Sequence, residues 1–372
     1  MRRWLGASAV AVALGAGAWA CDGDTTPAKQ FDSGADATTD APADAPADST
    51  VDAGPTRAKM LAIHASPDLP AVRVCFGMGL QNDGSDAVVA SVLPVPDKAL
   101  TGQPYPGLFP GAGAALPDFG IDLSQKALTP YLIVASKLAA STQSCDALLA
   151  PNAGTLTPGV DYFKMPTLKN GTFASDTTIA LVVTGCLPQA ADPSASAVLC
   201  GGDYGTSAGN LAVQLFSLDR AVKGAFGAQF LQASSAAAGK FALAYGTGDL
   251  TAELHPLDGG AGQPIATGVK YGELQPGTAA ALVAPDVNQT SLLVTVPGDG
   301  GAAFSSSFPL PLVYEVTTGQ PTGAAAYFAS GANYTFVLVG DPAQPTLLDG
   351  GAFNGYSLHA LAFPNSPPLP AP

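Results

Sequence analysis

Short apolar runs, each bounded by turn-forming residues, recur along the sequence after residue 57. The chain carries 43 glycines and 33 prolines, and no long amphipathic run follows the N-terminal region. Runs of this length, regularly interrupted by turns, are typical of strands in a sandwich or barrel. We therefore predict an all-β fold of two tandem immunoglobulin-like β-sandwich domains after a disordered acidic tether. The expected strands include 60–64, 71–76, 131–138, 177–184, 211–217, 241–245, 291–296 and 334–340.

The acidic residues are almost all aspartates, with 26 Asp against 3 Glu, and the net charge is −14. Aspartate favours turns and caps over helix interiors, so this ratio supports strands and loops. A chain this acidic repels nucleic acid, and the sequence shows no basic stripe. Both tryptophans lie within the first 19 residues, so a stacking or sugar-binding surface has to use Tyr or Phe.

Residues 1–20 resemble a bacterial export signal, with two arginines, an apolar run and small residues before Cys21. The run is too short to span a bilayer. Cleavage after Ala20 satisfies the ordinary A-x-A rule, which would give a secreted or periplasmic protein. The sequence AWAC at 18–21 also resembles a lipobox, whose cysteine receives a diacylglycerol. We favour lipidation of Cys21, because it would otherwise be an unpaired thiol in an oxidising compartment. The expected location is the bacterial cell envelope, lipid-anchored at the outer membrane or cell surface.

The segment after this cysteine is rich in Asp, Ala, Pro and Thr, and we predict that residues 21–57 form a disordered linker. It holds eight Asp, one Lys, one Arg and one aromatic residue. Such a segment cannot bury enough apolar surface to offset its chain entropy, and its charges extend it. Aspartate recurs every fourth residue from 32 to 52, but the glycines and rigid turns of calcium loops are missing. We therefore predict no metal and no cofactor.

Four cysteines remain besides Cys21, which is an even number in an exported chain. Two disulfides are therefore expected, and three pairings are possible. We prefer Cys186–Cys200, which closes a short polar loop, together with Cys75–Cys145, which closes a long one. A metal site is the rival interpretation, but the sequence lacks C-x-x-C spacing and nearby histidines.

The chain also repeats weakly. MLAIHASPDLPAVRVCFGMG at 60–79 aligns with AQFLQASSAAAGKFALAYGTG at 228–248, so that His64 falls on Gln232 and Ser66 on Ser234. Two further matches follow in the same order, 177–185 with 333–340 and 210–219 with 355–363. These matches predict two copies of one β domain, at 58–222 and 223–366, before a Pro-rich tail at 367–372.

Two turn motifs stand out between the apolar runs. Asn170-Gly171 lies between short extended flanks in TLKNGTFA, which is a strong hairpin signal. QNDGSDA at 81–87 offers four oxygen-bearing side chains for calcium, but it is half of a binding loop at best. We favour an ordinary Asp-Gly turn there. Gly-Gly and Asp-Gly pairs elsewhere are expected at hairpin tips.

The stretch IHASPDLPAVRVCFG at 63–77 resembles the opening motif of a bacterial exported-domain family, domain of unknown function 4397. The strand-like YTFVLVGD at 334–341 and the general layout add to this resemblance. The chain departs from the family pattern at Arg73, where Asp is frequent, and its second copy lacks the His, Pro and Asp. The resemblance implies a secreted or surface-attached protein, tandem copies and an immunoglobulin-like β architecture. It implies no activity.

The same stretch places His64, Ser66, Pro67 and Asp68 close together, which raises the question of a catalytic site. A triad needs a base that reaches its nucleophile and a third group that orients the base. Pro67 starts a turn, and an Asp in this position caps backbone N–H groups. We therefore predict a structural role for the motif and no enzymatic activity. A degenerate hydrolase remains a remote alternative that would need His64, His255 or His359 beside a nucleophile.

The predicted function is non-catalytic binding or adhesion at the bacterial surface, to an envelope polysaccharide or a surface protein. Sandwich loops would carry it, and the Pro- and Gly-rich segment 101–120 offers Tyr105, Phe109 and Phe119 as contacts. The alternative for these aromatics is that they cover the core of their own domain. The alternative for the protein is a structural spacer or assembly subunit without a soluble ligand. Expected partners are the membrane, through the lipid, and the surface ligand, but no nucleic acid.

Overall fold

A computed structural model places most of the chain after residue 57. The N-terminal signal, Cys21, the acidic linker, Phe119 and the Pro-rich tail lie outside the described residues. The described residues belong to one compact unit. Within the part of the chain that the structure places, no helix is long and apolar enough to cross a membrane. The described ranges are 58–99, 103–116, 124–138, 141–150, 155–174, 177–189, 191–221, 224–298, 301–347 and 353–365.

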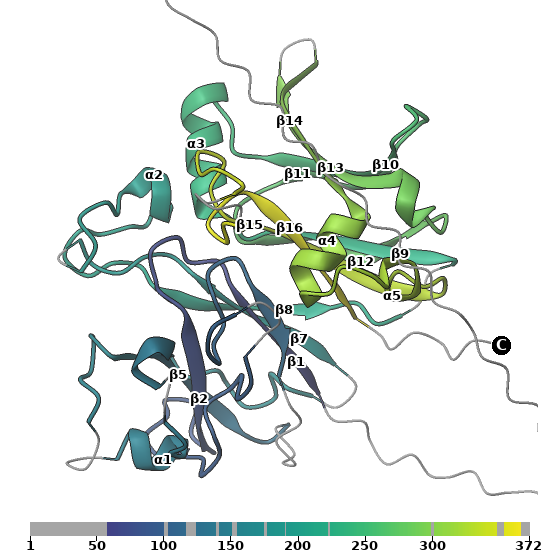
Figure 1. Ribbon diagram of the computed structural model, residues 1–372. Coiled ribbons are helices and arrows are strands. Elements are labelled where there is room, and N and C mark those ends of the chain that lie inside the picture. Colours follow the sequence, from purple (N-terminus) through teal and green to yellow (C-terminus); the bar gives the residue numbers. More distant parts are fainter. Residues whose placement is uncertain are drawn as a thin grey trace, which may run out of the picture. The chain divides into compact units, whose positions relative to one another are not determined.

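The described residues of the first half, between 58 and 221, form eight strands in two sheets. Figure 1 labels β1, β2, β5, β7 and β8 of this half. One sheet has the order β4-β1-β7-β8 and the other β3-β2-β5-β6. β1 and β7 run parallel, and the other neighbours are antiparallel. The strands are β1 (Lys59–His64), β2 (Val72–Gly79), β3 (Val88–Val89), β4 (Gly113–Ala115), β5 (Ala127–Val134), β6 (Tyr162–Lys164), β7 (Thr178–Thr184) and β8 (Ala212–Leu218).

The described residues of the second half, between 224 and 365, also form eight strands, and the strand order is that of the first half with eight added to every number. Its sheets are β12-β9-β15-β16 and β11-β10-β13-β14. Its one parallel pair, β9 and β15, corresponds to β1 and β7. The strands are β9 (Phe226–Gln232), β10 (Leu250–Pro256), β11 (Gln263–Val269), β12 (Glu273–Leu282), β13 (Thr290–Gly298), β14 (Gly301–Pro309), β15 (Ala332–Val339) and β16 (His359–Pro364).

The predicted all-β class and sandwich architecture are confirmed. In each half, alternate residues of the strands face a common core between the two sheets. The strand order differs from that of constant-type immunoglobulin domains, where the first two strands share a sheet. Here β1 and β2 lie in opposite sheets, as do β9 and β10. The likeness to immunoglobulin domains is therefore one of architecture.

Short helices connect the strands, and one of them corrects a prediction. Residues 241–245, expected as a strand, form the end of α3. The Ser234 hydroxyl accepts a hydrogen bond from the Ala237 N–H at 2.9 Å and caps this helix, and Gly246 ends it in the left-handed region. β10 therefore takes the place that corresponds to β2. The helices are η1 (Ala135–Leu138), α1 (Cys145–Leu148), α2 (Ala197–Cys200), α3 (Ser235–Tyr245), η2 (Val287–Gln289), α4 (Leu310–Thr318) and α5 (Ala324–Tyr327).

Two smaller predictions also need correction. The expected strand 131–138 ends at Val134 and continues as the short helix η1. Asn170-Gly171 does form a turn, with Gly171 at φ 79°, but its flanks do not pair with each other. Leu168 instead forms a bridge with Leu128 of β5, so a more distant strand satisfies the backbone that a local hairpin would have used.

The two halves meet through the outer faces of the sheets that contain β1 and β9. Along β1, Met60 and Ala62 face the core of the first half, whereas Leu61 and Ile63 face the second half. This second set, the junction cluster, explains why every residue of β7, β9 and β15 is buried. Its buried members are Leu61, Ile63, Ala65, Ala180, Val182, Leu218, Leu231, Ala233, Val337, Val339, Leu361 and Phe363.

Two disulfides form, in the preferred pairing of the three. Cys75 bonds to Cys145, and Cys186 bonds to Cys200. The first bond ties α1 to the outer face of β2, where Leu138 and Leu148 also cover the sheet. The second closes the polar loop that precedes and includes α2. Both disulfides lie in the first half.

Candidate functional site

His64, the last residue of β1, is fully buried beside the turn that its own strand enters. Its Nε2 lies 3.1 Å from the Pro70 carbonyl oxygen. Burial lowers the pKa of this imidazole to about 4, so the ring is neutral at pH 7 and Nε2 donates to the carbonyl. The contact closes the 65–70 turn onto the strand that precedes it.

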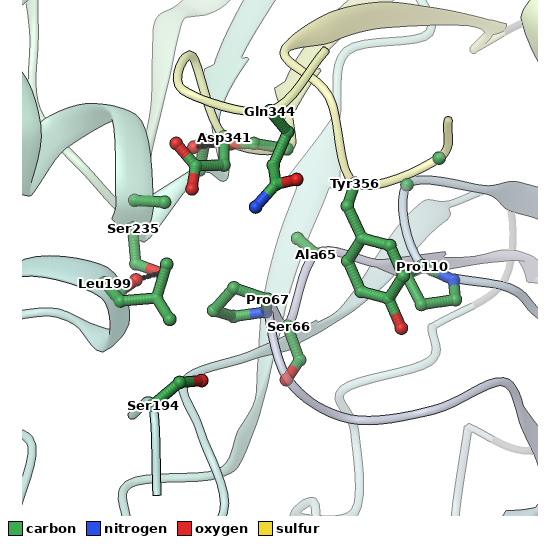
Figure 2. A pocket seen from close by; sticks show the side chains of 15 residues that line it. Ala65, Ser66, Pro67, Pro110, Ser194, Leu199, Ser235, Asp341, Gln344 and Tyr356 are labelled. Atoms are coloured by element: carbon green, nitrogen blue, oxygen red, sulfur yellow. Dashed lines mark hydrogen bonds between the residues drawn. The ribbon is translucent and has the colours of Figure 1, made fainter. Parts of the chain in front are cut away.

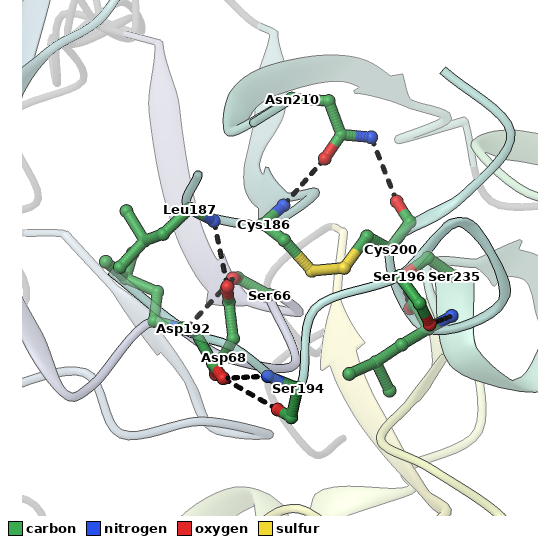
Figure 3. The surroundings of a disulfide bond; sticks show 12 residues. Ser66, Asp68, Cys186, Leu187, Asp192, Ser194, Ser196, Cys200, Asn210 and Ser235 are labelled. Carbon is green, nitrogen blue, oxygen red and sulfur yellow. Dashed lines mark hydrogen bonds between the residues drawn. A yellow bond between two sulfur atoms is a disulfide. The ribbon is translucent and has the colours of Figure 1, made fainter. Parts of the chain in front are cut away.

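Ser66 and Asp68 connect this turn to the second disulfide loop (Figure 3). The Ser66 hydroxyl donates to Asp68 Oδ1 at 3.1 Å and accepts from the Leu69 N–H at 3.3 Å. Asp68 Oδ2 accepts from the Leu187 N–H at 2.9 Å, directly after Cys186. Burial raises the pKa of Asp68 to about 6. The motif therefore carries hydrogen bonds that join two segments far apart in the sequence.

The corresponding turn of the second half follows β9. Gln232 stands where His64 stands in the first half, and its Oε1 accepts from the Ser234 N–H at 3.2 Å. The Ser234 hydroxyl donates to the Gly340 carbonyl, and it caps α3. Ser66 and Ser234 thus both accept from the N–H three residues later. Only the second turn continues as a helix, because Pro70 interrupts the first.

The other histidines are placed by backbone and carboxylate oxygens. His359 is buried at the start of β16, with Nδ1 2.6 Å from the Ser357 carbonyl and Nε2 2.8 Å from the Gly111 carbonyl. His255 Nδ1 lies 2.9 Å from Glu253 Oε1 on β10. The Ser291 hydroxyl donates to the backbone carbonyl of His255 at 3.3 Å and leaves the imidazole untouched. Among the described residues, the imidazole contacts go to backbone carbonyls and to Glu253, and none goes to a serine, threonine or cysteine side chain, which is the contact that the hydrolase alternative needs.

A cavity opens where the two turns meet, at one end of the junction cluster (Figure 2). Its volume is about 110 Å³. Segments from both halves line it: the turn after β1, the loop at 110–111, the disulfide loop, the start of α3 and the loop between β15 and β16. We call it the junction cavity. Its lining residues are Ala65, Ser66, Pro67, Pro110, Gly111, Ser194, Leu199, Ser234, Ser235, Ala236, Gly340, Asp341, Gln344, Gly355 and Tyr356.

The floor of the junction cavity is buried, and its mouth is exposed. Ser66, Ser235 and Asp341 are buried, whereas Gln344 and Tyr356 are exposed. Figure 2 shows Gln344 and Tyr356 extending from the loop after β15 toward the turn that carries Ser66 and Pro67. The site therefore presents amide and phenol groups to solvent and hydroxyl groups in its depth.

Polar contacts fix the walls of the cavity. Lys240 Nζ of α3 lies 2.6 Å from both carboxylate oxygens of Asp341, so this carboxylate is neutralised. The Ser235 hydroxyl donates to the Leu199 carbonyl of α2 at 2.8 Å, across the two halves. On the other side, a Cβ at Gly111 would come within 2.1 Å of the Gly355 carbonyl, and Gly111 has φ +73°. Only glycine allows that close approach.

Aromatic side chains stand near the mouth. Tyr105 and Phe109, predicted from the sequence, lie with ring centroids 5.1 Å apart and are half-buried. Tyr105 is close enough to Tyr356 to contribute to raising the pKa of the latter, although burial is the main cause. Phe353 packs edge-on against His359 at 5.0 Å. The structure thus places Tyr105 and Phe109 in ring contact with each other, outside the residues that line the cavity.

The lining contains residues that sequence reasoning missed, above all Ser235, Asp341, Gln344 and Tyr356. A signal existed for one of them, because Asp341 is the last residue of the YTFVLVGD stretch, two positions after β15 ends. The others carry no recognisable motif. In the turn at 81–87, Asp86 accepts from the N–H groups of Leu80 and Gln81. Within the described ranges, no group of three or more His, Cys, Asp or Glu side chains could hold a metal ion.

Comparisons with known proteins add little. No protein-family model matches the chain, and no curated protein matches it. Among solved structures, one described as a "putative cell adhesion protein" from Bacteroides eggerthii is 13% identical. The alignment covers 85% of this chain and 98% of that one, with a TM-score of 0.14. A TM-score this low carries no argument about fold or function.

Proposed function

We propose that this protein is a cell-envelope lipoprotein that binds a surface polysaccharide without chemical reaction. In this proposal a lipid on Cys21 holds the protein in the membrane, and the acidic segment 21–57 spaces the β-sandwich unit from it. The proposal includes the resemblance to the exported domain of unknown function 4397. Loops at one end of the unit make the binding site.

The junction cavity is the observation that carries the binding proposal. It combines hydroxyl and amide groups with nearby aromatic rings, and these are the groups that recognise a ligand with many hydroxyls and apolar ring faces. Tyr356 lines the cavity, and the Tyr105–Phe109 pair, outside the lining but with Tyr105 close enough to affect the pKa of Tyr356, extends the aromatic surface. Tryptophan, the usual choice, is absent after residue 19.

Electrostatics favours a neutral polysaccharide over an anionic one. No lysine or arginine lines the junction cavity, and Lys240 beside it is paired with Asp341. Asp68 and Asp192 are close enough to raise the pKa of Tyr356 further. With a net charge of −14, the chain repels carboxylated and phosphorylated polymers.

The binding proposal is tested by pelleting. The full-length chain with Cys21→Ser, which cannot be lipidated, is mixed with insoluble envelope polysaccharide and centrifuged. We expect saturable pelleting, and a loss of affinity of about fivefold or more in Tyr356→Ala, the size of a typical interface contact of about 1 kcal/mol. Tyr245→Ala is the matched control, because Tyr245 is similarly exposed, at 42%, but does not line the cavity. Absence of pelleting would overturn the proposal and favour the spacer or assembly-subunit alternative.

The anchor is tested separately by detergent phase partition. The wild-type chain, expressed in a bacterium that processes lipoproteins, should enter the detergent phase, because a diacylglycerol adds a large buried apolar area. Cys21→Ser should stay in the aqueous phase. Equal partition of the two chains would remove the lipid from the proposal and leave a secreted or periplasmic protein.

A further inference from the structure

We infer that the junction cavity receives the terminal sugar of a neutral glycan chain, bound end-on. This inference rests on the proposed function and names the part of the polysaccharide that is recognised. It is carried by the size of the cavity, by the hydrogen-bonding capacity of its floor and by the way in which the two halves enclose it.

Size restricts the ligand to one small group. Pockets for drug-sized molecules usually have volumes of roughly 300 Å³ or more. The junction cavity has about 110 Å³, with a buried floor and walls from both halves. A polymer that passed through would need an exit at both ends of its path. A chain terminus needs only to enter past the exposed lining residues, which include Ser194, Gln344 and Tyr356.

The floor of the cavity offers acceptors and few free donors. The hydroxyl hydrogen of Ser66 is used by Asp68, that of Ser234 by Gly340, and that of Ser235 by the Leu199 carbonyl. A hydroxyl oxygen has two lone pairs. Ser66 and Ser234 each use one of them for a backbone N–H, of Leu69 and Ala237, and keep one to accept with. The floor therefore suits incoming O–H groups, which donate, and disfavours carboxylate or phosphate, which only accept.

The mouth supplies the complementary contacts. Gln344 is exposed, and its side-chain amide can both donate and accept, while Tyr356 adds a hydroxyl and a ring face. A sugar ring held between them would place hydroxyls toward the floor and an apolar face against Tyr356. The remainder of the glycan would leave through the same opening into solvent.

Competition between chain ends and chain interiors tests the inference. The full-length Cys21→Ser chain is bound to insoluble envelope polysaccharide and released with two competitors of equal total sugar content. One is the soluble polymer, and the other is the same polymer cut to short fragments by mild acid. We expect the fragments to compete about tenfold better or more, because they carry more ends. Equal potency of the two competitors would overturn end-on binding while leaving polysaccharide binding intact.

Two variants locate the binding in the cavity. Ser194→Tyr fills the mouth and should abolish competition by fragments. Gln344→Ala removes the amide and should weaken it about fivefold, while Gln143→Ala, an exposed glutamine outside the cavity lining, should change nothing. Ser194 and Gln344 are both exposed, so we expect both variants to fold, and circular dichroism checks this. Unchanged pelleting and fragment competition in both cavity variants would overturn the inference, whereas absence of pelleting in the parent chain would remove the proposed function itself.

Discussion

In the first half of the unit, a disulfide-linked segment covers the outer sheet, whereas in the second half aromatic rings fill the core. Cys75, Cys145 and Leu138 shield the outer face of β2 and β5. The second half has no disulfide, and its core includes Phe226 stacked on Tyr334 at 5.0 Å. Two sandwiches of the same strand order thus reach stability by different means, so the strand order does not depend on either device.

A second contrast lies at the turns that follow β1 and β9. Both begin with a serine that accepts from the N–H three residues later. In the first half, Pro67 and Pro70 prevent the turn from continuing as a helix. Asp68 connects this turn to the second disulfide loop through the Leu187 N–H. In the second half an alanine-rich run continues as α3. The two corresponding turns, after β1 and after β9, therefore line the junction cavity with different residues. Two identical turns would line it with the same residues on both sides.

The largest expected effect comes from removing the disulfides, which distinguish the first half from the second. Removing Cys75–Cys145 by a double substitution to alanine should cost about 4 kcal/mol of unfolding free energy, because its sequence separation is 70 residues. The same change at Cys186 and Cys200, separated by 14, should cost about 3 kcal/mol. Urea unfolding followed by circular dichroism measures both losses.

Ligand binding should rank the two disulfide variants in the opposite order. The Cys186–Cys200 loop supplies Ser194 and Leu199 to the junction cavity, whereas the first disulfide lies away from it. We expect weaker polysaccharide pelleting only after loss of the second disulfide. Equal polysaccharide binding by both variants would show that the loop at 186–200 lines the junction cavity without the Cys186–Cys200 bond.

The next effect concerns His64 against its counterpart Gln232. The pKa of His64 is lowered from 6.5 to about 4 in the folded protein, so the unfolded chain binds the proton first as pH falls. This group stabilises fully above pH 6.5, and about 3 kcal/mol of that stability is lost as pH falls to 4. His64→Gln, which copies the second half, should flatten the dependence of unfolding free energy on pH over this window.

Two other groups also contribute to the pH dependence of the unfolding free energy, but they do not change the direction of the difference between the wild type and His64→Gln. The pKa of Asp68 is raised from 3.8 to about 6, so its protonation between these values favours the folded state and partly offsets His64. The pKa of buried His359 is also lowered by burial, and this histidine remains in the variant. His255→Gln, at a partly exposed site on β10, is the control. Parallel pH curves for the wild type and His64→Gln would contradict the assignment.

The smallest effect compares the two serine caps. Ser234→Ala should cost about 1 to 2 kcal/mol, because it removes a cap of an eleven-residue helix together with a bond to Gly340. Ser66→Ala should cost less, since its bond to the Leu69 N–H is longer, at 3.3 Å, and no helix follows. Thermal unfolding by circular dichroism ranks them. The reverse order would mean that the link from Ser66 to Asp68 matters more than the cap.

Local pattern accounts for much of the fold. Continuous apolar runs such as 177–184 and 334–340 were predicted as strands, and they form β7 and β15. The prediction of a strand at 241–245 was wrong, because five consecutive apolar residues fit a helix as well as a strand. The cap from Ser234 and the packing of α3 decided that segment. Tyr105 and Phe109 were identified as candidate contacts, whereas Gln344 and Tyr356, in a loop without a motif, were not.

The sequence by itself determined the composition of the protein, its β class, the strands with their two-residue periodicity and the cysteines available for pairing. Burial of β7, β9 and β15 on both faces was not among the predictions. Only the tertiary structure decided what covers the second face, and it brought Ser66, Ser235 and Tyr356 to one cavity. These residues are far apart along the chain, and no local pattern encodes their distance. The packing of the sheet that contains β1 against the sheet that contains β9 sets the distances between these residues.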